Sequence, residues 1–159
     1  MKIGLSASHK KRAEANAVKW FNKFICLRDL EKDETTGEIK GYCISCGKEW
    51  EAILYSDRSI MNGKEWHAGH YWKSDRHESV RFHEWNVSGQ HGHCNVYKHG
   101  DEANYEGNLR IKIGDDNFLI LRFLKNQIKK NSIIDYENIT KEYKEKTKIE
   151  AKRLGIKHY

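Results

Sequence analysis

The amino-acid sequence predicts an α+β protein in which a small zinc-braced core is flanked by N- and C-terminal helices. Only 38% of the 159 residues are hydrophobic and 33% are charged, which argues against a large apolar core. Histidine and cysteine gather in the middle of the chain, where a bound metal can stabilise a small core. We expect one compact unit with three segments, residues 1–40, 41–114 and 115–159.

Residues 1–40 are expected to form a basic helix followed by an acidic loop. From about residue 10 to residue 30, apolar side chains recur at three- and four-residue spacing on one helix face: Ala13, Ala17, Trp20, Phe21, Phe24 and Ile25. The acidic stretch 31–38 contains Thr-Thr-Gly turn residues and is expected to end the helix.

Residues 41–114 have the pattern of short strands broken by turns. The runs 48–54 and 65–68 have strand character, and Asn62–Gly63 predicts a hairpin between them. A short helix is expected over residues 105–113, ended by Gly114.

Residues 115–159 are expected to form two further helices, over about 118–129 and 136–154. On the second helix, four lysines share one face and are candidates for contact with DNA phosphates: Lys141, Lys144, Lys148 and Lys152. Glutamates interleave with them, as on an ordinary solvated helix, but the positive excess favours phosphate contact.

The charge distribution favours a polyanionic partner. The net charge is +6, with +6 on residues 1–28, −6 on residues 29–119 and +6 on residues 120–159. The sequence lacks an apolar run long enough to span a bilayer and an apolar signal core, so we expect a cytoplasmic protein without a membrane partner. Disulfides are not expected in that compartment, which leaves metal ligation or burial for the four cysteines.

Two cysteine-containing pairs have the spacing of a structural zinc site. Cys43 and Cys46 form a Cys-x-x-Cys knuckle, and His91 and Cys94 repeat the two-residue spacing. His93 is an alternative fourth ligand, because it is adjacent to Cys94. A pair of buried cysteines or a redox pair is the other interpretation, although no βαβ pattern surrounds the knuckle.

Between and beside these pairs the sequence resembles the HNH endonucleases, which have a ββα-metal (His-Me finger) core. The resemblance rests on a strand bearing two histidines, an asparagine in the following loop and an asparagine beside the last cysteine: His67, His70, Asn86 and Asn95. A narrower resemblance, over about residues 10–130, is to the phage NinG/Rap family of recombination nucleases. Its motifs are Cys-x-x-Cys-Gly at 43–47, Ala-Gly-His-Tyr at 68–71, Val-Arg-Phe at 80–82, Gln90, Cys94–Asn95 and Gly100.

The resemblance implies a structure-selective endonuclease that acts on branched recombination intermediates, including Holliday junctions and D-loops, in the host-cell cytoplasm if the source is a phage. It further implies that His70 is the general base and that Asn86 orients it. Asn95 and His67 would ligate one divalent ion, Mg²⁺ or Mn²⁺. His99 is a third candidate ligand, and Lys98 is a candidate phosphate contact.

Two positions depart from the expected family pattern. His91 stands where a cysteine is expected, and it remains a competent zinc ligand. His67 stands where an aspartate is expected, which shifts the metal preference from Mg²⁺ toward Mn²⁺, Ni²⁺ or Zn²⁺.

Two other function classes remain open at this point. A non-catalytic, zinc-stabilised DNA-binding protein explains the basic ends and the knuckle, but leaves His67, His70, Asn86 and Asn95 unexplained. A zinc-held domain that binds another protein is the third class. A homodimer is a further expectation, because branched DNA with two-fold symmetry suits a two-fold protein.

Overall fold

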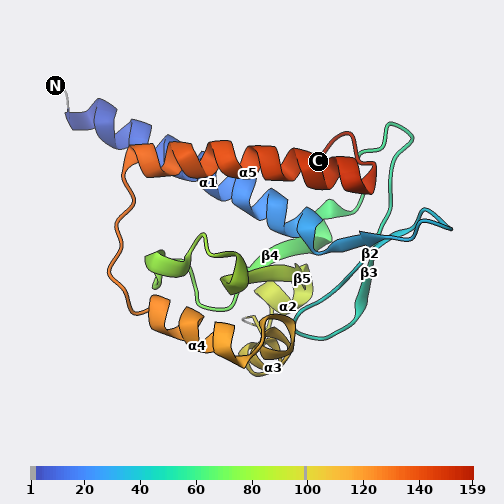
Figure 1. The fold of residues 1–159 in the computed structure, drawn as a ribbon. Helices are drawn as coiled ribbons and strands as arrows, with labels where there is room; N and C mark the ends of the chain where they lie inside the picture. The colour runs from blue at the N-terminus through green and yellow to red at the C-terminus, as the bar shows by residue number, and fades with distance from the viewer. Residues whose placement is uncertain (1–2, 99) are drawn as a thin grey trace.

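The computed structural model describes residues 3–98 and 100–159, which form a mixed α+β fold (Figure 1). The α+β class predicted from the sequence is therefore confirmed. The main elements, in chain order, are α1 (Ile3–Arg28), β1 (Leu30–Lys32), β2 (Ile39–Tyr42), β3 (Glu49–Ala52), β4 (Trp66–His70), β5 (Val87–His91), α2 (Gly92–Val96), α3 (Glu102–Ile113), α4 (Asp115–Leu124) and α5 (Ile133–Leu154).

The strands form two small antiparallel sheets. One has the order β1-β2-β3, and the other is the pair β4-β5, in which His67 lies opposite Gln90 and His70 lies opposite Val87. Strand β5 runs directly into α2, so hairpin and helix are consecutive in the chain. The expected boundary at residue 40 falls inside β2.

One expectation about the central strands was wrong, and another needs a smaller correction. The acidic stretch is a loop with the expected turn over residues 33–38, but residues 31 and 32 belong to β1, which pairs with β2. Asn62–Gly63 does not join two paired strands, because β3 pairs with β2 and β4 pairs with β5. The φ of Asn62 is −105°, whereas a tight hairpin turn of this kind requires a positive φ. The Asn62 side chain instead bonds the backbone of Glu51 and Ile53.

The helices match their expected positions, with shifted ends. Helix α3 ends before Gly114, whose φ is +81°, as expected. Helix α4 ends at Leu124, five residues earlier than expected, and α5 begins at Ile133, three residues earlier. A capping box between Ser132 and Asp135 fixes the start of α5, because each side chain bonds the other's backbone N–H.

The two end helices pack against each other in the same direction and form one layer over the β4-β5 hairpin (Figure 1). Their shared core contains Phe21, Phe24 and Tyr143, and Val87 of β5 joins it from below. The apolar face predicted for α1 is therefore buried, with Trp20 half-buried at its edge. Within the described residues, none of the helices combines the length and apolar character that crossing a bilayer requires.

Candidate functional site

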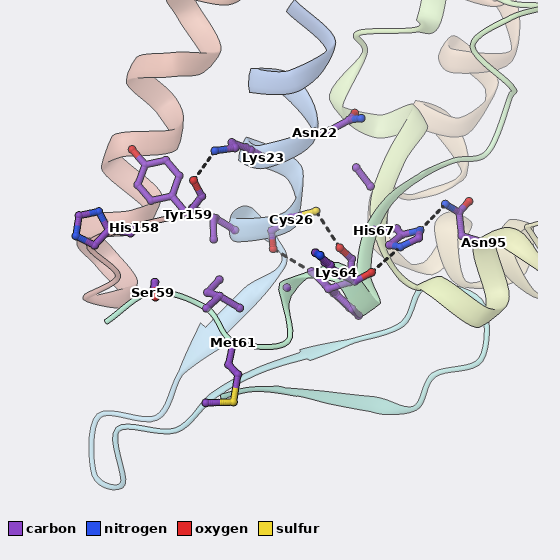
Figure 2. Close-up of a pocket in the computed structure, with 15 residues that line it drawn as sticks. Asn22, Lys23, Cys26, Ser59, Met61, Lys64, His67, Asn95, His158 and Tyr159 are labelled. Atoms are coloured by element: carbon purple, nitrogen blue, oxygen red, sulfur yellow. Dashed lines mark hydrogen bonds between the residues drawn. The ribbon is translucent and has the colours of Figure 1, made fainter. Parts of the chain in front are cut away.

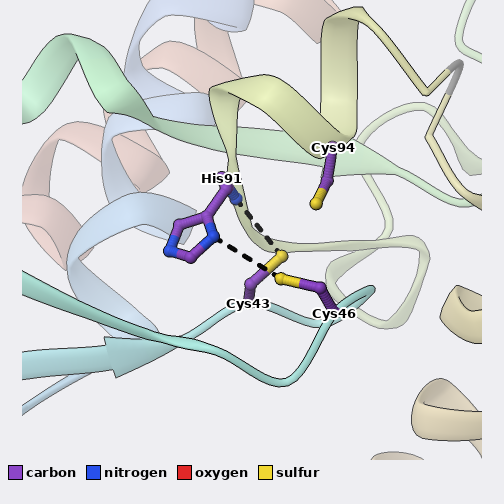
Figure 3. A group of neighbouring side chains, drawn as sticks. All are labelled: Cys43, Cys46, His91 and Cys94. Carbon is purple, nitrogen blue, oxygen red and sulfur yellow. Dashed lines mark hydrogen bonds between the residues drawn. The ribbon is translucent and has the colours of Figure 1, made fainter.

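Four side chains converge where the knuckle meets the junction of β5 and α2 (Figure 3). The ligand atoms of Cys43, Cys46, His91 and Cys94 all lie within 4.8 Å of one another. His91 Nδ1 lies 3.5 Å from Cys46 Sγ, and the His91 backbone N–H donates to Cys43 Sγ at 3.3 Å. One metal ion can contact all four atoms, and three thiolates with one imidazole are a donor set of structural zinc sites.

Local backbone geometry explains how the knuckle forms. Gly47 has a φ of +67°, and its N–H bonds the Cys43 carbonyl at 2.8 Å. This tight turn brings the Cys43 and Cys46 side chains to the same side of the loop. His91 is the last residue of β5 and Cys94 lies in the first turn of α2, so the strand–helix junction supplies the other two ligands.

Within the cluster, the thiol of Cys46 ionises more readily than that of Cys94. Burial opposes ionisation of Cys46, but hydrogen bonds from the Lys48 backbone and from the neighbouring thiols lower its pKa. Burial and the neighbouring cysteines raise the pKa of Cys94 to about 12. Neighbouring thiolates repel one another, and a bound divalent cation would offset this repulsion and allow all the sulfurs to bind as thiolates.

His93 and Cys26 are not part of the cluster. His93, the alternative ligand, is exposed and packs its ring on Tyr97 at 5.6 Å between centroids. His91 is therefore the fourth member of the cluster. Cys26 lies on α1, where its thiol donates to the Trp66 carbonyl at 3.6 Å and burial raises its pKa to about 12.

His67 and Asn95 meet between β4 and α2 (Figure 2). His67 Nε2 lies 2.9 Å from the Lys64 carbonyl oxygen, which only accepts hydrogen bonds, so Nε2 carries the proton. Nδ1 is then the lone-pair nitrogen, and Asn95 Nδ2 donates to it at 3.1 Å. A half-turn of the amide would present Oδ1 beside Nδ1, which would give a nitrogen and oxygen pair able to bind a divalent cation.

This pair lies at the edge of a cavity of about 690 Å³ that extends from α1 to α2. Lys23 of α1, Lys64 and Tyr159 also line it. Figure 2 shows His67 and Asn95 at one end and Lys23 with Tyr159 at the other. The two predicted metal ligands therefore face a space large enough for a small organic ligand.

His70 is half-buried at the end of β4. Its Nε2–H donates to the Arg81 carbonyl at 3.0 Å, which fixes the tautomer and leaves Nδ1 as the proton acceptor. Its ring lies 6.5 Å from that of Phe21. Burial lowers the pKa of His70 and outweighs the hydrogen bond to Arg81, so the imidazole is neutral at pH 7. A neutral imidazole with one free nitrogen has the chemistry of a general base.

Asn86 is fully buried and bonds across the loop that follows β4. Its Oδ1 accepts from the Trp72 N–H at 2.9 Å, and its Nδ2 donates to the carbonyls of Trp72 and Val80 at 3.0 and 3.1 Å. Within the described residues it makes no hydrogen bond to His70. It fixes the backbone immediately before Arg81, whose carbonyl holds His70, so any orienting effect on the imidazole is indirect.

The structure does not bring His70 together with His67 and Asn95. Side chains three residues apart on a strand point to opposite faces, and the contacts agree. His67 faces Asn95 of α2, whereas His70 faces Phe21 of α1 and is not among the residues that line the cavity.

The other residues predicted to bind metal or DNA are exposed on the surface, except for one that lies outside the described residues. Lys98 is exposed after α2, and His99 lies outside the described residues. The α5 lysines 141, 144, 148 and 152 are exposed on one face, although Lys148 pairs with Glu145 at 2.7 Å. Sequence reasoning missed the roles of Lys64 and Arg81, which act through backbone carbonyls and therefore leave no side-chain signal.

Comparison with known protein families gave one match. The family described as bacteriophage lambda NinG protein matches residues 4–153, nearly the whole chain. No match was found among curated proteins or among solved structures. The chain belongs to the NinG family.

Proposed function

Starting from this family membership, we propose that the chain is a metal-dependent DNA endonuclease that hydrolyses phosphodiester bonds in branched recombination intermediates, such as Holliday junctions and D-loops. It would act in the cytoplasm of the host cell. The observation that carries the proposal is the contact between His67 and Asn95. Two potential ligands from different elements meet at the edge of a cavity, in a chain with a separate four-ligand cluster.

The zinc cluster would position the catalytic ligands. It links the knuckle to the start of α2, and Asn95 directly follows Cys94 on that helix. His67 donates its other ring N–H to a backbone carbonyl, an arrangement that metal-binding histidines use to hold the ring and the tautomer. A divalent ion at His67 and Asn95 would stabilise negative charge on the scissile phosphate and on the leaving oxygen.

In this proposal His70 is the general base. Its Nδ1 would take a proton from water while Nε2–H stays bonded to the Arg81 carbonyl. Asn86 would hold the loop that carries this carbonyl. Lys98 and the lysines of α5 would contact phosphates. The order β4, β5, α2 supports the proposal, because a ββα unit is what the HNH resemblance implies.

The test is cleavage of three substrates: a mobile four-way junction, a linear duplex of matched sequence and a single strand. Each is incubated with Mg²⁺, with Mn²⁺ and without added divalent ion. We expect cutting of the junction that depends on metal and is abolished in His70→Ala, while DNA binding stays near normal. Cutting by His70→Ala at the wild-type rate would remove His70 as the base.

Ligand variants test the metal assignment against a matched control. His67→Ala and Asn95→Ala should lose cleavage, whereas His93→Ala, an exposed histidine nearby, should retain it. His67→Asp replaces imidazole with a carboxylate and should move the preference from Mn²⁺ toward Mg²⁺. If the metal preference of His67→Asp is the same as that of the wild type, His67 is not a ligand of the divalent ion.

A second candidate is a non-catalytic, zinc-stabilised DNA-binding protein. One observation favours it, namely that His70 lies on the opposite face of β4 from His67 and Asn95 and packs against α1. Junction binding without cutting in any metal, and equal for wild type and His70→Ala, would select this candidate.

A further inference from the structure

Three lysines from both end helices surround the half-buried Trp20 ring. The ammonium nitrogens of Lys19 and Lys23 on α1 lie 5.8 and 5.2 Å from its centroid, and that of Lys144 on α5 lies 5.6 Å away. Tyr159 packs edge-on against the same indole, at 6.4 Å between centroids. The parallel packing of α1 and α5 creates this group, since neither helix alone holds all its members.

Two of these three charges, Lys19 and Lys144, are poorly neutralised within the described residues. Among the described residues, Lys19 and Lys144 form no ion pair with a carboxylate side chain, and Lys23 donates to the main-chain oxygen of Tyr159. The next lysines along α5 differ, because Lys146 pairs with two glutamates and Lys148 with one. Partial burial, and then repulsion by the charge of Lys19, lower the pKa of Lys23. A bound anion would relieve this repulsion.

Two members of this group also line the cavity that ends at the candidate metal ligands. Lys23 and Tyr159 lie at one end of it, and His67 and Asn95 lie at the other (Figure 2). Lys19, Trp20 and Lys144 lie outside this lining. Its volume of about 690 Å³ lies within the roughly 300–1,000 Å³ of sites that hold small organic molecules, so it can accept bases and sugars of a single strand. A duplex is too wide to enter such a space, because it presents two paired strands, whereas a single strand can insert one base at a time.

We propose that one unpaired DNA strand binds along this path, with its phosphates on Lys19, Lys23 and Lys144 and its bases against Trp20 and Tyr159, and that it continues through the cavity to His67 and Asn95. Aromatic rings combined with a basic groove are the general means of binding single strands. The inference rests on the proposed function, which it deepens, because branched intermediates expose unpaired strands at the branch point.

Charge reversal tests the path without disturbing the core, since Lys19 and Lys144 are exposed. The variant is Lys19→Glu with Lys144→Glu. The control is Lys129→Glu with Lys130→Glu, two exposed lysines after α4 whose reversal changes the net charge equally. Fluorescence anisotropy measures the affinity for a single strand of about 16 nucleotides and for a duplex, without added divalent ion, between about 50 and 200 mM salt. Thermal melting verifies that both variants are folded.

We expect the path variant to bind the single strand at least about tenfold more weakly than the control, and its salt slope to fall by about 1.4, as the loss of two phosphate contacts requires. Equal weakening in both variants would overturn the inference. A loss as large for duplex as for single strand would also overturn it, because the surface would then contact duplex phosphates. Binding is measured without cleavage, so selective loss supports the path even if no substrate is cut. Conversely, if the wild-type protein cuts DNA but the path variant binds the single strand as well as the control does, the proposed function stands and the strand path is rejected.

Discussion

The Asp29 carboxylate accepts a hydrogen bond of 2.7 Å from the backbone N–H of Gly89 and thereby ties the end of α1 to the middle of β5. Arg28 donates to both Asp29 oxygens at 2.8 and 3.0 Å, and Lys112 of α3 donates to Oδ2 at 2.8 Å. One carboxylate therefore joins three elements around the hairpin that carries the candidate site.

Asp29→Asn should lower the free energy of unfolding by about 3 kcal/mol. The Asp29 side chain is only 10% exposed, and its loss leaves the charges of Arg28 and Lys112 without their counter-ion. Urea denaturation at pH 7 measures the effect. Glu38→Gln is the control, because Glu38 pairs with Lys40 at the surface and its neutralisation should cost less than about 1 kcal/mol.

The same substitution predicts a pH dependence. Burial opposes ionisation of Asp29, but the hydrogen bond and charge of Arg28, followed by Lys112, lower its pKa in the folded protein. Its stabilising contribution is therefore complete above the unfolded pKa of about 3.9 and is lost as the pH falls through the folded value. The difference between wild type and Asp29→Asn should shrink below about pH 4. A difference that stays constant down to pH 2 would mean that the carboxylate charge is not what stabilises this junction.

Gly89→Ala should destabilise the protein by about 3 kcal/mol, whereas Gly107→Ala should stabilise it by about 0.5–1 kcal/mol. A Cβ on Gly89 would lie 2.2 Å from Cζ2 of Trp66. That indole cannot retreat, because it is buried and stacked on Trp50 at 5.2 Å between centroids. Gly107 lies inside α3 with no atom within 4 Å of the added methyl group. Thermal melting of both variants measures the contrast, and equal melting temperatures would contradict it.

Much of the candidate site was predictable, because its determinants are local. The candidate metal ligands come in two pairs with two-residue spacing, so Cys43, Cys46 and Cys94 could be assigned from the sequence. The two-residue spacing to Cys94 also favoured His91 over His93, and the structure agrees, because His91 joins the cluster whereas His93 is exposed. The helices were predictable from apolar periodicity, as the buried face of α1 illustrates.

The features that were not predictable depend on long-range packing. Strand β1 has three residues and one buried apolar side chain, Leu30, so its pattern is too short to indicate a strand. The pairing of α1 with α5 joins residues more than 100 positions apart. An amphipathic pattern predicts that a helix face is buried, but it does not predict which other element covers that face. Once β4 is known to be a strand, the alternation of its side chains places His67 and His70 on opposite faces. Choosing site residues by their type alone does not reveal this separation.

The cluster of three cysteines and one histidine should hold one zinc ion per chain, measured by elemental analysis of the purified protein. Cys94→Ser should lose the zinc and unfold, because structural zinc contributes directly to folding. Cys26→Ser and His93→Ala are the controls, since neither side chain belongs to the cluster, and both variants should retain one equivalent. Retention of zinc by Cys94→Ser, or its loss from Cys26→Ser, would reject this ligand set.

The pH profile of junction cleavage should report the environment of His70. A general base must be deprotonated, so the rate should rise with pH and level off above the pKa of the base. Because burial lowers the pKa of His70, the midpoint of the rise should lie below the ordinary histidine value of about 6.5. His70→Ala is expected not to cut, and any cleavage that it retains should lack this rise. His83→Ala is the matched control, because burial also lowers the pKa of His83 although it has no assigned role, and this variant should keep the wild-type midpoint. A midpoint above about 6.5, or a rise that persists unchanged in His70→Ala, would assign the proton transfer to another group.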